Sequence, residues 1–204
     1  MESIQGKQRV ELDTTALAAR LAGYARILVD LGTGDGRFVQ HNATACPRTF
    51  AIGVDSCREQ LRAASRRAPV NALYLIASAE ALPAALAGLA DHITINFPWG
   101  SLQRGLLAGD PALLGGLVAI ARPGARLELR LNGGALAEQG WSLDAGAERV
   151  RRVLCAAGFA MRAPGALDAT DLRACPTTWA RRLAVGRDPR AIALAGVYCS
   201  HREP

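Results

Sequence analysis

Short apolar runs alternate with longer segments in which apolar and polar positions mix at helical spacing. The apolar runs predict buried strands, and the mixed segments between them predict helices. We expect strands at 27–29, 49–54, 72–77, 92–97, 126–131, 159–162 and 191–198. We expect helices at 13–24, 57–68, 106–121, 143–157 and 178–185, a short one through Phe38 and Val39, and a further one beginning at Pro83. The helix at 106–121 should have a break near Gly109-Asp110-Pro111. Strands that alternate with helices indicate an α/β fold, with a mostly parallel sheet covered by helices on both faces.

Residues 1–25 precede the first core strand and form an extension of the same domain. Alternating positions around Gly6 predict a short hairpin at 4–12, and Asp13 can cap the helix that follows. We see no internal repeat and no linker, and 204 residues are enough for one sizeable core. We therefore expect a single domain over residues 1–204.

The first core strand runs directly into a glycine loop, in the stretch I-L-V-D-L-G-T-G-D-G at 27–36. Gly32, Gly34 and Gly36 let the backbone turn sharply and let a ligand approach it closely. The spacing differs from the G-x-G-x-x-G of dinucleotide sites, and the stretch carries two acids, Asp30 and Asp35. Carboxylates repel a pyrophosphate but attract the sulfonium and ammonium groups of S-adenosylmethionine. The loop therefore indicates a methyl-donor site; a nucleotide-phosphate site and a turn without a ligand are the alternatives.

Composition and charge limit the cell compartment in which the protein can act and the kind of partner that it can bind. Half of the residues are hydrophobic and 21% are charged, as in an ordinary globular protein. The N-terminus lacks the apolar core of a signal peptide, and no apolar run approaches a membrane span. The five scattered cysteines form no C-x-x-C pair, so we expect free thiols and no metal site. The net charge of +6 permits a polyanionic partner, but arginine is abundant throughout, so only clustered arginines indicate a site.

Two acids follow the next strands of the predicted sheet. Ligands in such folds bind beyond the carboxyl ends of the strands, so residues at these ends should line one crevice. Asp55 ends the second strand, where it can bind the ribose hydroxyls of an adenosine or cap the next helix. Glu80 follows the third strand, where it can border the adenine or begin a solvated helix.

The fourth strand ends in Asn96-Phe97-Pro98-Trp99. Many amino-methyltransferases carry Asn or Asp before Pro-Pro and an aromatic residue at this place, where the polar side chain holds an exocyclic amine. Phe97 interrupts that pattern, which disfavours an exocyclic amine as the methyl acceptor. A ring nitrogen with an in-plane lone pair needs only a position in line with the methyl group. We therefore favour a ring nitrogen as acceptor, with Trp99 beside it; a core tryptophan in a turn is the alternative.

Two arginine clusters favour a nucleic-acid partner. Trp179 is followed by Arg181, Arg182 and Arg187 on the connection before the last strand. An aromatic ring can stack on a base while guanidinium groups bind phosphates. The second cluster consists of Arg58, Arg62 and Arg66, which are spaced by four and so form one stripe along a helix, and of the adjacent Arg67. This stripe can also be an ordinary solvated helix face.

With these stretches in view, the chain resembles the aminoglycoside-resistance methyltransferases that modify N1 of adenine 1408 in 16S ribosomal RNA. The stretches occur in the family's order and are V-D-L-G-T-G-D-G-R at 29–37, I-G-V-D at 52–55, A-S-A-E-A-L-P at 77–83, F-P-W-G-S-L at 97–102 and T-T-W-A-R-R-L-A-V-G-R at 177–187. The first is general to methyltransferases. The last two are more specific, because each brings one of the two tryptophans with which the family sandwiches a flipped adenine.

The resemblance implies a Rossmann-like sheet of seven strands with the last one antiparallel, S-adenosylmethionine as donor, and the assembled 30S subunit as substrate. By matching position it implies a donor site lined by Asp30, Gly32, Gly34, Asp55, Ala79, Glu80, Trp99, Ser101 and Thr177. It assigns the catalytic task of holding the base to Trp99 and Trp179. It assigns the RNA contacts to Arg66, Arg67, Arg182 and Arg187.

We therefore expect an enzyme that methylates N1 of adenine 1408 and so confers aminoglycoside resistance. One alternative is a methyltransferase for another RNA base or for a small molecule, although the latter would favour an apolar lid over two tryptophans flanked by arginines. Another alternative is a donor-binding or RNA-binding protein without turnover. We expect a cytoplasmic monomer that binds neither DNA nor membranes.

Overall fold

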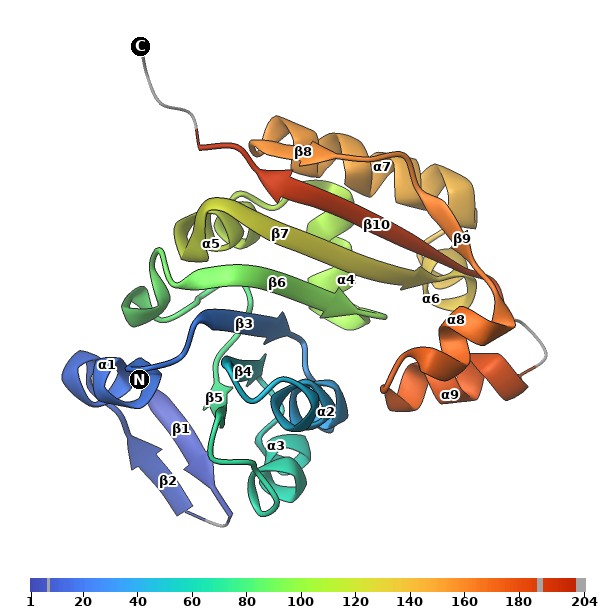
Figure 1. The fold of residues 1–204 in the computed structure, drawn as a ribbon. Helices are drawn as coiled ribbons and strands as arrows, with labels where there is room; N and C mark the ends of the chain where they lie inside the picture. The colour runs from blue at the N-terminus through green and yellow to red at the C-terminus, as the bar shows by residue number, and fades with distance from the viewer. Residues whose placement is uncertain (7, 187–188, 201–204) are drawn as a thin grey trace.

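The computed structural model describes residues 1–6, 8–186 and 189–200. The strands form one sheet in the order β2-β1-β5-β4-β3-β6-β7-β10-β8, and β9 also pairs with β10 (Figure 1). The strands are β1 (Glu2–Gln5), β2 (Gln8–Glu11), β3 (Arg26–Leu31), β4 (Thr49–Asp55), β5 (Ala72–Ile76), β6 (Ala90–Asn96), β7 (Ala121–Asn132), β8 (Phe159–Met161), β9 (Gly165–Leu167) and β10 (Ala191–Tyr198). The helices are α1 (Thr14–Leu21), α2 (Arg37–Ala45), α3 (Arg58–Ser65), α4 (Gly100–Ala108), α5 (Pro111–Ile120), α6 (Gly133–Glu138), α7 (Leu143–Ala156), α8 (Ala169–Ala174) and α9 (Thr178–Val185), with one 3-10 turn, η1 (Ala84–Leu86).

The predicted topology is confirmed. Strands β5, β4, β3, β6 and β7 run parallel to one another, and β10 is antiparallel to its neighbours β7 and β8. The N-terminal hairpin is also present, because β1 and β2 pair through a turn at Gly6 (φ 60°) and β1 extends the sheet beyond β5. The three-residue strand β9 is not predicted by the sequence pattern and, with the hairpin, makes the sheet ten-stranded.

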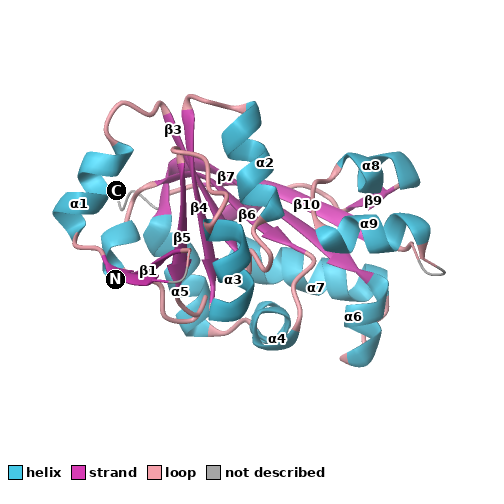
Figure 2. Cartoon of the chain, turned by 90° about the horizontal axis from the view of Figure 1, so that it is seen from below, coloured by secondary structure: helices cyan, strands magenta, loops and turns pink. Residues whose placement is uncertain are grey.

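Helices cover the two faces of the sheet unequally. The helices α1, α4, α5 and α7 pack on one face in the main core, and α2 and α3 pack on the other in a second cluster around Tyr74. Figure 2 shows α2 on one side of the sheet and α4, α5 and α7 on the opposite side. In the described part of the chain, no helix lies over the middle of β6, β7 and β10 on the α2 side (Figure 1). The expectation of helices on both faces is therefore wrong for this half of the sheet.

The uncovered side carries polar residues at alternate strand positions. His92, Thr94 and Asn96 lie on β6, and β7 presents Arg126, Glu128 and Arg130 beside them. The residues between them, such as Ile95 and Leu129, face the main core and are fully buried. The polar side needs no helix because its side chains bond to one another and to solvent.

The helices near the sheet's ends differ in detail from the sequence pattern. The helix expected at Pro83 is only the turn η1, because Gly88 follows with a φ of 63° and donates a hydrogen bond to the Ala119 carbonyl. The helix expected at 106–121 is two helices, and the first begins already at Gly100. Gly109 ends α4 and Asp110 caps α5, so the predicted break is confirmed. Among the described helices, none is long and apolar enough to cross a membrane.

Candidate active site

The glycine loop, Gly32–Gly36, joins β3 to α2 at the carboxyl end of the sheet. All three glycines have positive φ, at 68° for Gly32, 54° for Gly34 and 70° for Gly36. A Cβ at Gly32 would lie 2.7 Å from the Leu102 side chain, and one at Gly36 would lie 2.6 Å from the Tyr74 ring. Both conformation and space therefore exclude side chains at these two positions, so the loop keeps a bare backbone that a ligand can approach.

A cavity of about 600 Å³ opens beside this loop at the carboxyl ends of β3, β4, β5 and β6. We call it the donor cavity. Every residue predicted to hold the methyl donor lines it, that is, Asp30, Gly32, Gly34, Asp55, Ala79, Glu80, Trp99, Ser101 and Thr177. Trp179 and Arg182 line it as well. The volume is within the range of small-molecule sites.

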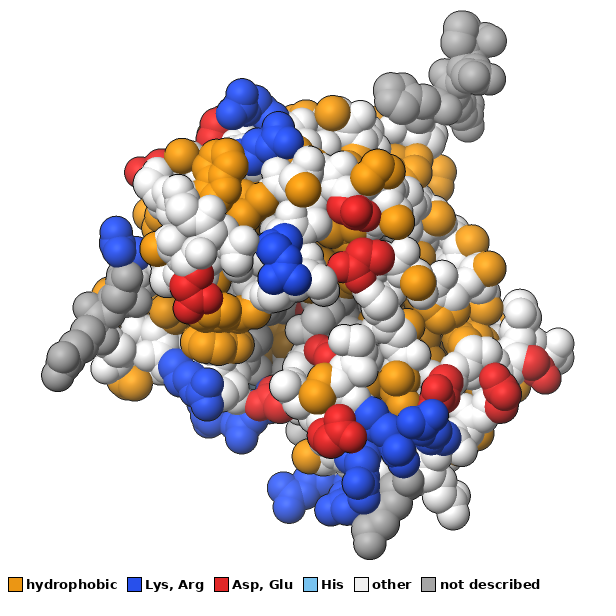
Figure 3. Space-filling view, turned by 180° about the vertical axis from the view of Figure 1, so that it is seen from behind, with side chains coloured by type: hydrophobic (Ala, Val, Ile, Leu, Met, Phe, Trp, Pro, Cys, Tyr) orange, Lys and Arg blue, Asp and Glu red, His pale blue; other side chains and the backbone are white. Residues whose placement is uncertain are grey.

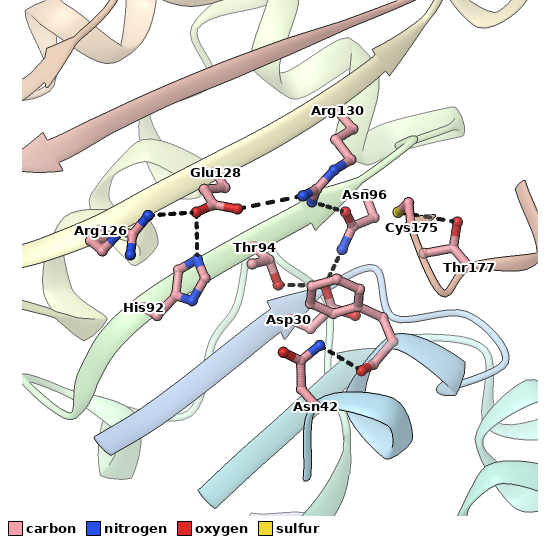
Figure 4. Close-up of polar contacts among 11 residues, drawn as sticks. Asp30, Asn42, His92, Thr94, Asn96, Arg126, Glu128, Arg130, Cys175 and Thr177 are labelled. Carbon is pink, nitrogen blue, oxygen red and sulfur yellow. Dashed lines mark hydrogen bonds and ion pairs between the residues drawn. The ribbon is translucent and has the colours of Figure 1, made fainter. Parts of the chain in front are cut away.

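Asp30 is a buried carboxylate, 1% exposed, near the end of β3. Its Oδ1 accepts hydrogen bonds from Thr94 Oγ1 at 2.7 Å and Asn96 Nδ2 at 2.9 Å (Figure 4). Burial raises the pKa of Asp30 to about 6, although these hydrogen bonds and the nearby charge of Arg130 oppose the rise. Asp30 is therefore mostly ionised at neutral pH and can pair with a cationic ligand.

Arg130 on β7 links this carboxylate to a second polar cluster. Its Nη1 donates to Asn96 Oδ1 at 2.7 Å, and its Nη2 lies 3.5 Å from Oε2 of Glu128 (Figure 4). The nearby His92 ring, whose Nε2 lies 3.5 Å from Oε1 of Glu128, and the charges of Arg130 and Arg126 lower the pKa of Glu128 well below its usual value. The Asn96 amide therefore donates to Asp30 and accepts from Arg130, so the oxygen that would accept a hydrogen bond from a substrate amine already has a partner.

Phe97 accounts for this orientation. It has a φ of 52°, the one positive value among the described non-glycine residues. Its ring is buried with Leu172 and Ala180 in a small apolar cluster under α8 and α9. The left-handed turn separates Asn96, which faces Asp30, from Trp99, which lines the donor cavity. Phe97, which interrupts the amine-holding pattern in the sequence, is thus also the residue at which the backbone turns between Asn96 and Trp99.

Asp55 uses both carboxylate oxygens within the chain. Its Oδ2 accepts a hydrogen bond from the Gly34 N–H at 2.8 Å, and its Oδ1 accepts one from the Cys57 N–H at 2.7 Å. The first bond holds the glycine loop. The second goes to the residue before α3 and not to the first turn of that helix, so Asp55 does not cap α3. A carboxylate oxygen can accept more than one hydrogen bond, so the predicted ribose contact stays possible and stays a prediction.

Glu80 lies in a turn after β5, and no helix begins there. Its carboxylate accepts a hydrogen bond from Ser78, which is the main cause of a lowered pKa for Glu80. Ser101, in the first turn of α4, contributes a further lowering effect from the other side of the cavity. Glu80 is thus a charged group on the cavity wall.

Trp99 and Trp179 meet at the donor cavity. Trp99 precedes α4 and Trp179 is the second residue of α9, which Thr177 caps by accepting a hydrogen bond from the Ala180 N–H at 2.9 Å. The two indole rings stack with centroids 5.0 Å apart and planes 26° from parallel. The Arg182 guanidinium lies 5.2 Å from the Trp179 ring centroid. Two large π-faces, one with a cation beside it, therefore stand beside the residues of the donor cavity.

The NpmA family model, described as 16S rRNA (adenine(1408)-N(1))-methyltransferase, matches residues 2–198. The chain belongs to this family. It is 32% identical to the 16S rRNA (adenine(1408)-N(1))-methyltransferase of Streptoalloteichus hindustanus, over 96% of this chain and 98% of that relative. It is 28% identical to the Escherichia coli protein of the same name, over 97% of this chain and 99% of that relative. A mutant of the Catenulisporales acidiphilia enzyme of that name, solved with its cosubstrate SAM, is similar with a TM-score of 0.87 at 29% identity, covering 100% of this chain and 99% of the other.

Membership of the family makes this protein an S-adenosylmethionine-dependent methyltransferase. The donor cavity fits that molecule in shape and charge. Four carboxylates on its wall, those of Asp30, Asp35, Asp55 and Glu80, suit a ligand with cationic and hydroxyl groups. The glycine loop also keeps a bare backbone beside the cavity, because a Cβ at Gly32 would overlap the Leu102 side chain.

The arginines predicted to contact RNA in this family member lie in separate places. Arg182 is on α9 at the donor cavity, whereas Arg66 and Arg67 follow α3 and are exposed. Seen from behind, basic side chains gather along the lower edge of the molecule (Figure 3). Arg187 lies outside the described residues. The RNA contacts of all four stay predictions.

Sequence reasoning missed the roles of Thr94 and Arg130 and the contact of Thr178 with the glycine loop. The first two had a signal, because polar residues alternate with apolar ones in H-I-T-I-N at 92–96 and R-L-E-L-R at 126–130. Such alternation is typical of a strand with one polar side. Thr178 had no signal of its own, since its partner lies far away in the sequence.

Proposed function

We propose that this protein transfers the methyl group of S-adenosylmethionine to N1 of adenine 1408 in the 16S rRNA of the assembled 30S subunit. The observation that carries the proposal is the stack of Trp99 and Trp179 beside a cavity with four carboxylates. An adenine that leaves its helix presents two π-faces, and two indoles can hold it from both sides. The relatives that cover nearly the whole chain are named for this reaction.

The residues divide the work between donor and base. Asp30 would pair with the cationic part of the donor and Asp55 would bind its ribose, next to the bare backbone of the glycine loop. When bound, S-adenosylmethionine supplies an electrophilic methyl group on its sulfonium. Trp99 and Trp179 would align the in-plane N1 lone pair of the base with that methyl group. No proton leaves N1, so no general base is needed, and the two indole faces stabilise the positive charge that develops on the ring.

The slot for the base is closed in the free chain. The indole centroids are 5.0 Å apart, whereas a ring inserted between them needs two stacking distances, together about 7 Å. Base binding therefore replaces one indole–indole contact by two indole–base contacts. Trp179 is 36% exposed, and its helix is short, so this is the ring that can move at lower cost.

An exocyclic amine is a less suitable acceptor for this site. The Asn96 side chain, which would hold such an amine, donates to Asp30 and accepts from Arg130. A substrate amine would have to donate to the same amide oxygen that already accepts from Arg130. The in-plane nitrogen of an adenine makes no such demand.

The test is radiolabelled methyl transfer from S-adenosylmethionine to purified 30S subunits, with free 16S rRNA and small-molecule extracts as parallel substrates. We expect label in the 30S sample and a reverse-transcription stop at adenine 1408, because an N1-methylated adenine cannot pair. Label confined to small molecules, or a stop at another base, would replace the proposal by the alternative of a different substrate. Donor binding without any label would indicate a protein without turnover.

The proposal includes the consequence of the modification. A methylated N1 can no longer accept a hydrogen bond from an aminoglycoside and carries a charge that repels this cationic drug class. We infer that expression gives aminoglycoside resistance. We also propose that the enzyme acts as a monomer in the cytoplasm, which sedimentation of the purified protein would test for the oligomeric state.

A further inference from the structure

Helix α9 is held from two sides. On its buried side, Ala180 is fully enclosed in the apolar cluster that contains Phe97 and Leu172. On the other side, Thr178 and Trp179 in its first turn line the donor cavity. The packed side determines where the helix lies, and the contacts of the first turn determine where the Trp179 ring stands.

Thr178 makes a direct polar contact with the glycine loop. Its Oγ1 donates a hydrogen bond of 2.5 Å to Oδ2 of Asp35, which lies 143 residues earlier in the chain. Across the residues that the structure describes, this is the one side-chain hydrogen bond between α9 and the loop. The Arg37 Nε lies 3.1 Å from the same oxygen. A hydrogen bond to a carboxylate is stronger than one between neutral groups, so it can hold a helix turn in place.

Asp35 is a firm anchor because both of its neighbours are held. The Gly34 N–H donates to Asp55 at 2.8 Å, and the Tyr74 hydroxyl donates to the Gly36 carbonyl at 3.1 Å. Tyr74 is 1% exposed, in the interior of the sheet's second apolar cluster. The position of the Asp35 carboxylate is thereby tied to the same loop that forms the wall of the donor cavity.

We propose that Asp35 and Thr178 form a latch through which the glycine loop positions Trp179 for the target base. Thr178 directly precedes Trp179, so any rotation of the first turn of α9 moves the hydroxyl and the indole together. Both are positioning residues, because they act on the base through Trp179. The inference rests on the proposed function, which gives the Trp179 ring a base to hold.

The test compares five variants with the wild-type protein. Thr178→Val removes the hydroxyl and keeps the side-chain shape, Asp35→Ala removes the acceptor, and the double variant removes both. Thr178→Ser keeps the donor group and serves as the rescue. Thr170→Val is the matched control, because Thr170 is an exposed threonine on the neighbouring helix α8. Three quantities are measured for each variant: the donor dissociation constant by calorimetry, kcat and KM on 30S subunits, and the circular dichroism couplet of the stacked indoles in the free protein.

We expect Thr178→Val and Asp35→Ala each to lower kcat/KM on 30S subunits by about tenfold and to weaken the indole couplet. The double variant should lose no more than the worse of the two, because both changes break one contact. Thr178→Ser and Thr170→Val should stay within about twofold of wild type. Donor affinity of Thr178→Val should also stay within about twofold.

The latch is wrong if Thr178→Val keeps the wild-type couplet and kcat/KM, or if the losses of the two single variants multiply in the double variant. It is also wrong if donor affinity falls in step with activity, since the pair would then belong to donor binding. The couplet is measured without donor or RNA. A wild-type protein that methylates no 30S subunit but whose couplet depends on Thr178 would therefore refute the proposed function and leave the latch standing.

Discussion

Trp99 and Trp179 stack directly on each other, with ring centroids 5.0 Å apart and planes 26° from parallel. Trp99 stands before α4, next to the donor residues, whereas Trp179 belongs to a short helix that is packed on one side only. The contact therefore joins a half-buried ring at the donor cavity to a ring that is 36% exposed. Because of this asymmetry, a change of Trp179 should affect methylation more than it affects the free energy of unfolding.

Trp179→Ala should lower methylation of 30S subunits by about ten- to a hundredfold or more, because stacking on one aromatic ring contributes roughly 1–3 kcal/mol. Trp179→Phe should keep much of the activity, since a π-face remains. Donor affinity should survive, and the free energy of unfolding should fall by about 0.5–1.5 kcal/mol, the usual contribution of an aromatic pair, because the 36% exposed ring stacks on Trp99. The measurements are methyl transfer, calorimetry and thermal unfolding.

Trp141 provides the matched control for that experiment, because it packs against the main core. Trp141→Ala should lower the melting temperature more than Trp179→Ala does. A Trp179→Ala protein that melts far earlier than wild type would show that Trp179 is a core residue. Wild-type methylation by that variant would remove Trp179 from the base site.

Asp55→Ala should weaken donor binding by about 1.5–3 kcal/mol, the usual loss for a hydrogen bond to a charged group. Two effects combine, because the carboxylate faces the donor cavity and also holds the Gly34 N–H. Asp55→Asn keeps an acceptor oxygen for one of these bonds and should lose less. Calorimetry on the folded variants checks this, and unchanged donor affinity in Asp55→Ala would contradict the assignment.

The parts of the fold with local causes could be predicted from the sequence. The predicted bounds of α9 and β10 agree with the structure, because a threonine cap opens α9 and an apolar run defines β10. The predicted donor residues all line one cavity because the carboxyl ends of parallel strands meet at one edge. These predictions needed only propensity, caps and the general topology of such sheets.

The parts that depend on distant partners could not be predicted. No sequence pattern predicts the partners of the Asn96 side chain, which accepts from Arg130 on another strand and donates to Asp30. The pairing of Asp35 with Thr178 depends on how α9 folds back over the glycine loop. The uncovered half of the sheet could be predicted in part. The alternation at 126–130 indicates a polar side, whereas the alternation of strands with helices predicted helices on both faces.

Expression in a susceptible bacterium should protect against kanamycin and apramycin, which contact adenine 1408, as the resemblance implies. It should not protect against gentamicin, for which resistance is usually linked to a neighbouring guanine. Minimum inhibitory concentrations with wild-type protein and with the Trp179→Ala variant check this prediction. Protection against gentamicin alone would mean that the target base is a different one, and equal protection by the variant would mean that methylation is not the cause.

Donor binding should depend on pH through Asp30. Burial raises the pKa of this carboxyl to about 6, so it loses its charge as the pH falls through that value. A cationic donor binds the ionised form, and the bound cation lowers the pKa of Asp30 further. Protonated Asp30 must therefore lose its proton when the donor binds. Donor affinity is thus highest at pH values above the pKa of Asp30 in the free protein. With one proton involved, the donor dissociation constant should be about tenfold larger at pH 5 than at pH 7.

Asp30→Asn isolates this effect from the other acids of the cavity. The amide carries no charge at either pH, so the variant should bind the donor more weakly than wild type at pH 7 and show little further change at pH 5. The other acids of the cavity, Asp35, Asp55 and Glu80, are unchanged in it, so a pH dependence that persists would have a source other than Asp30. Calorimetry at pH 5, 6 and 7 in two buffers of different ionisation enthalpy also gives the number of protons released. Wild-type binding that releases no proton near pH 6, or that strengthens as the pH falls, would contradict a charged Asp30 as partner of the donor.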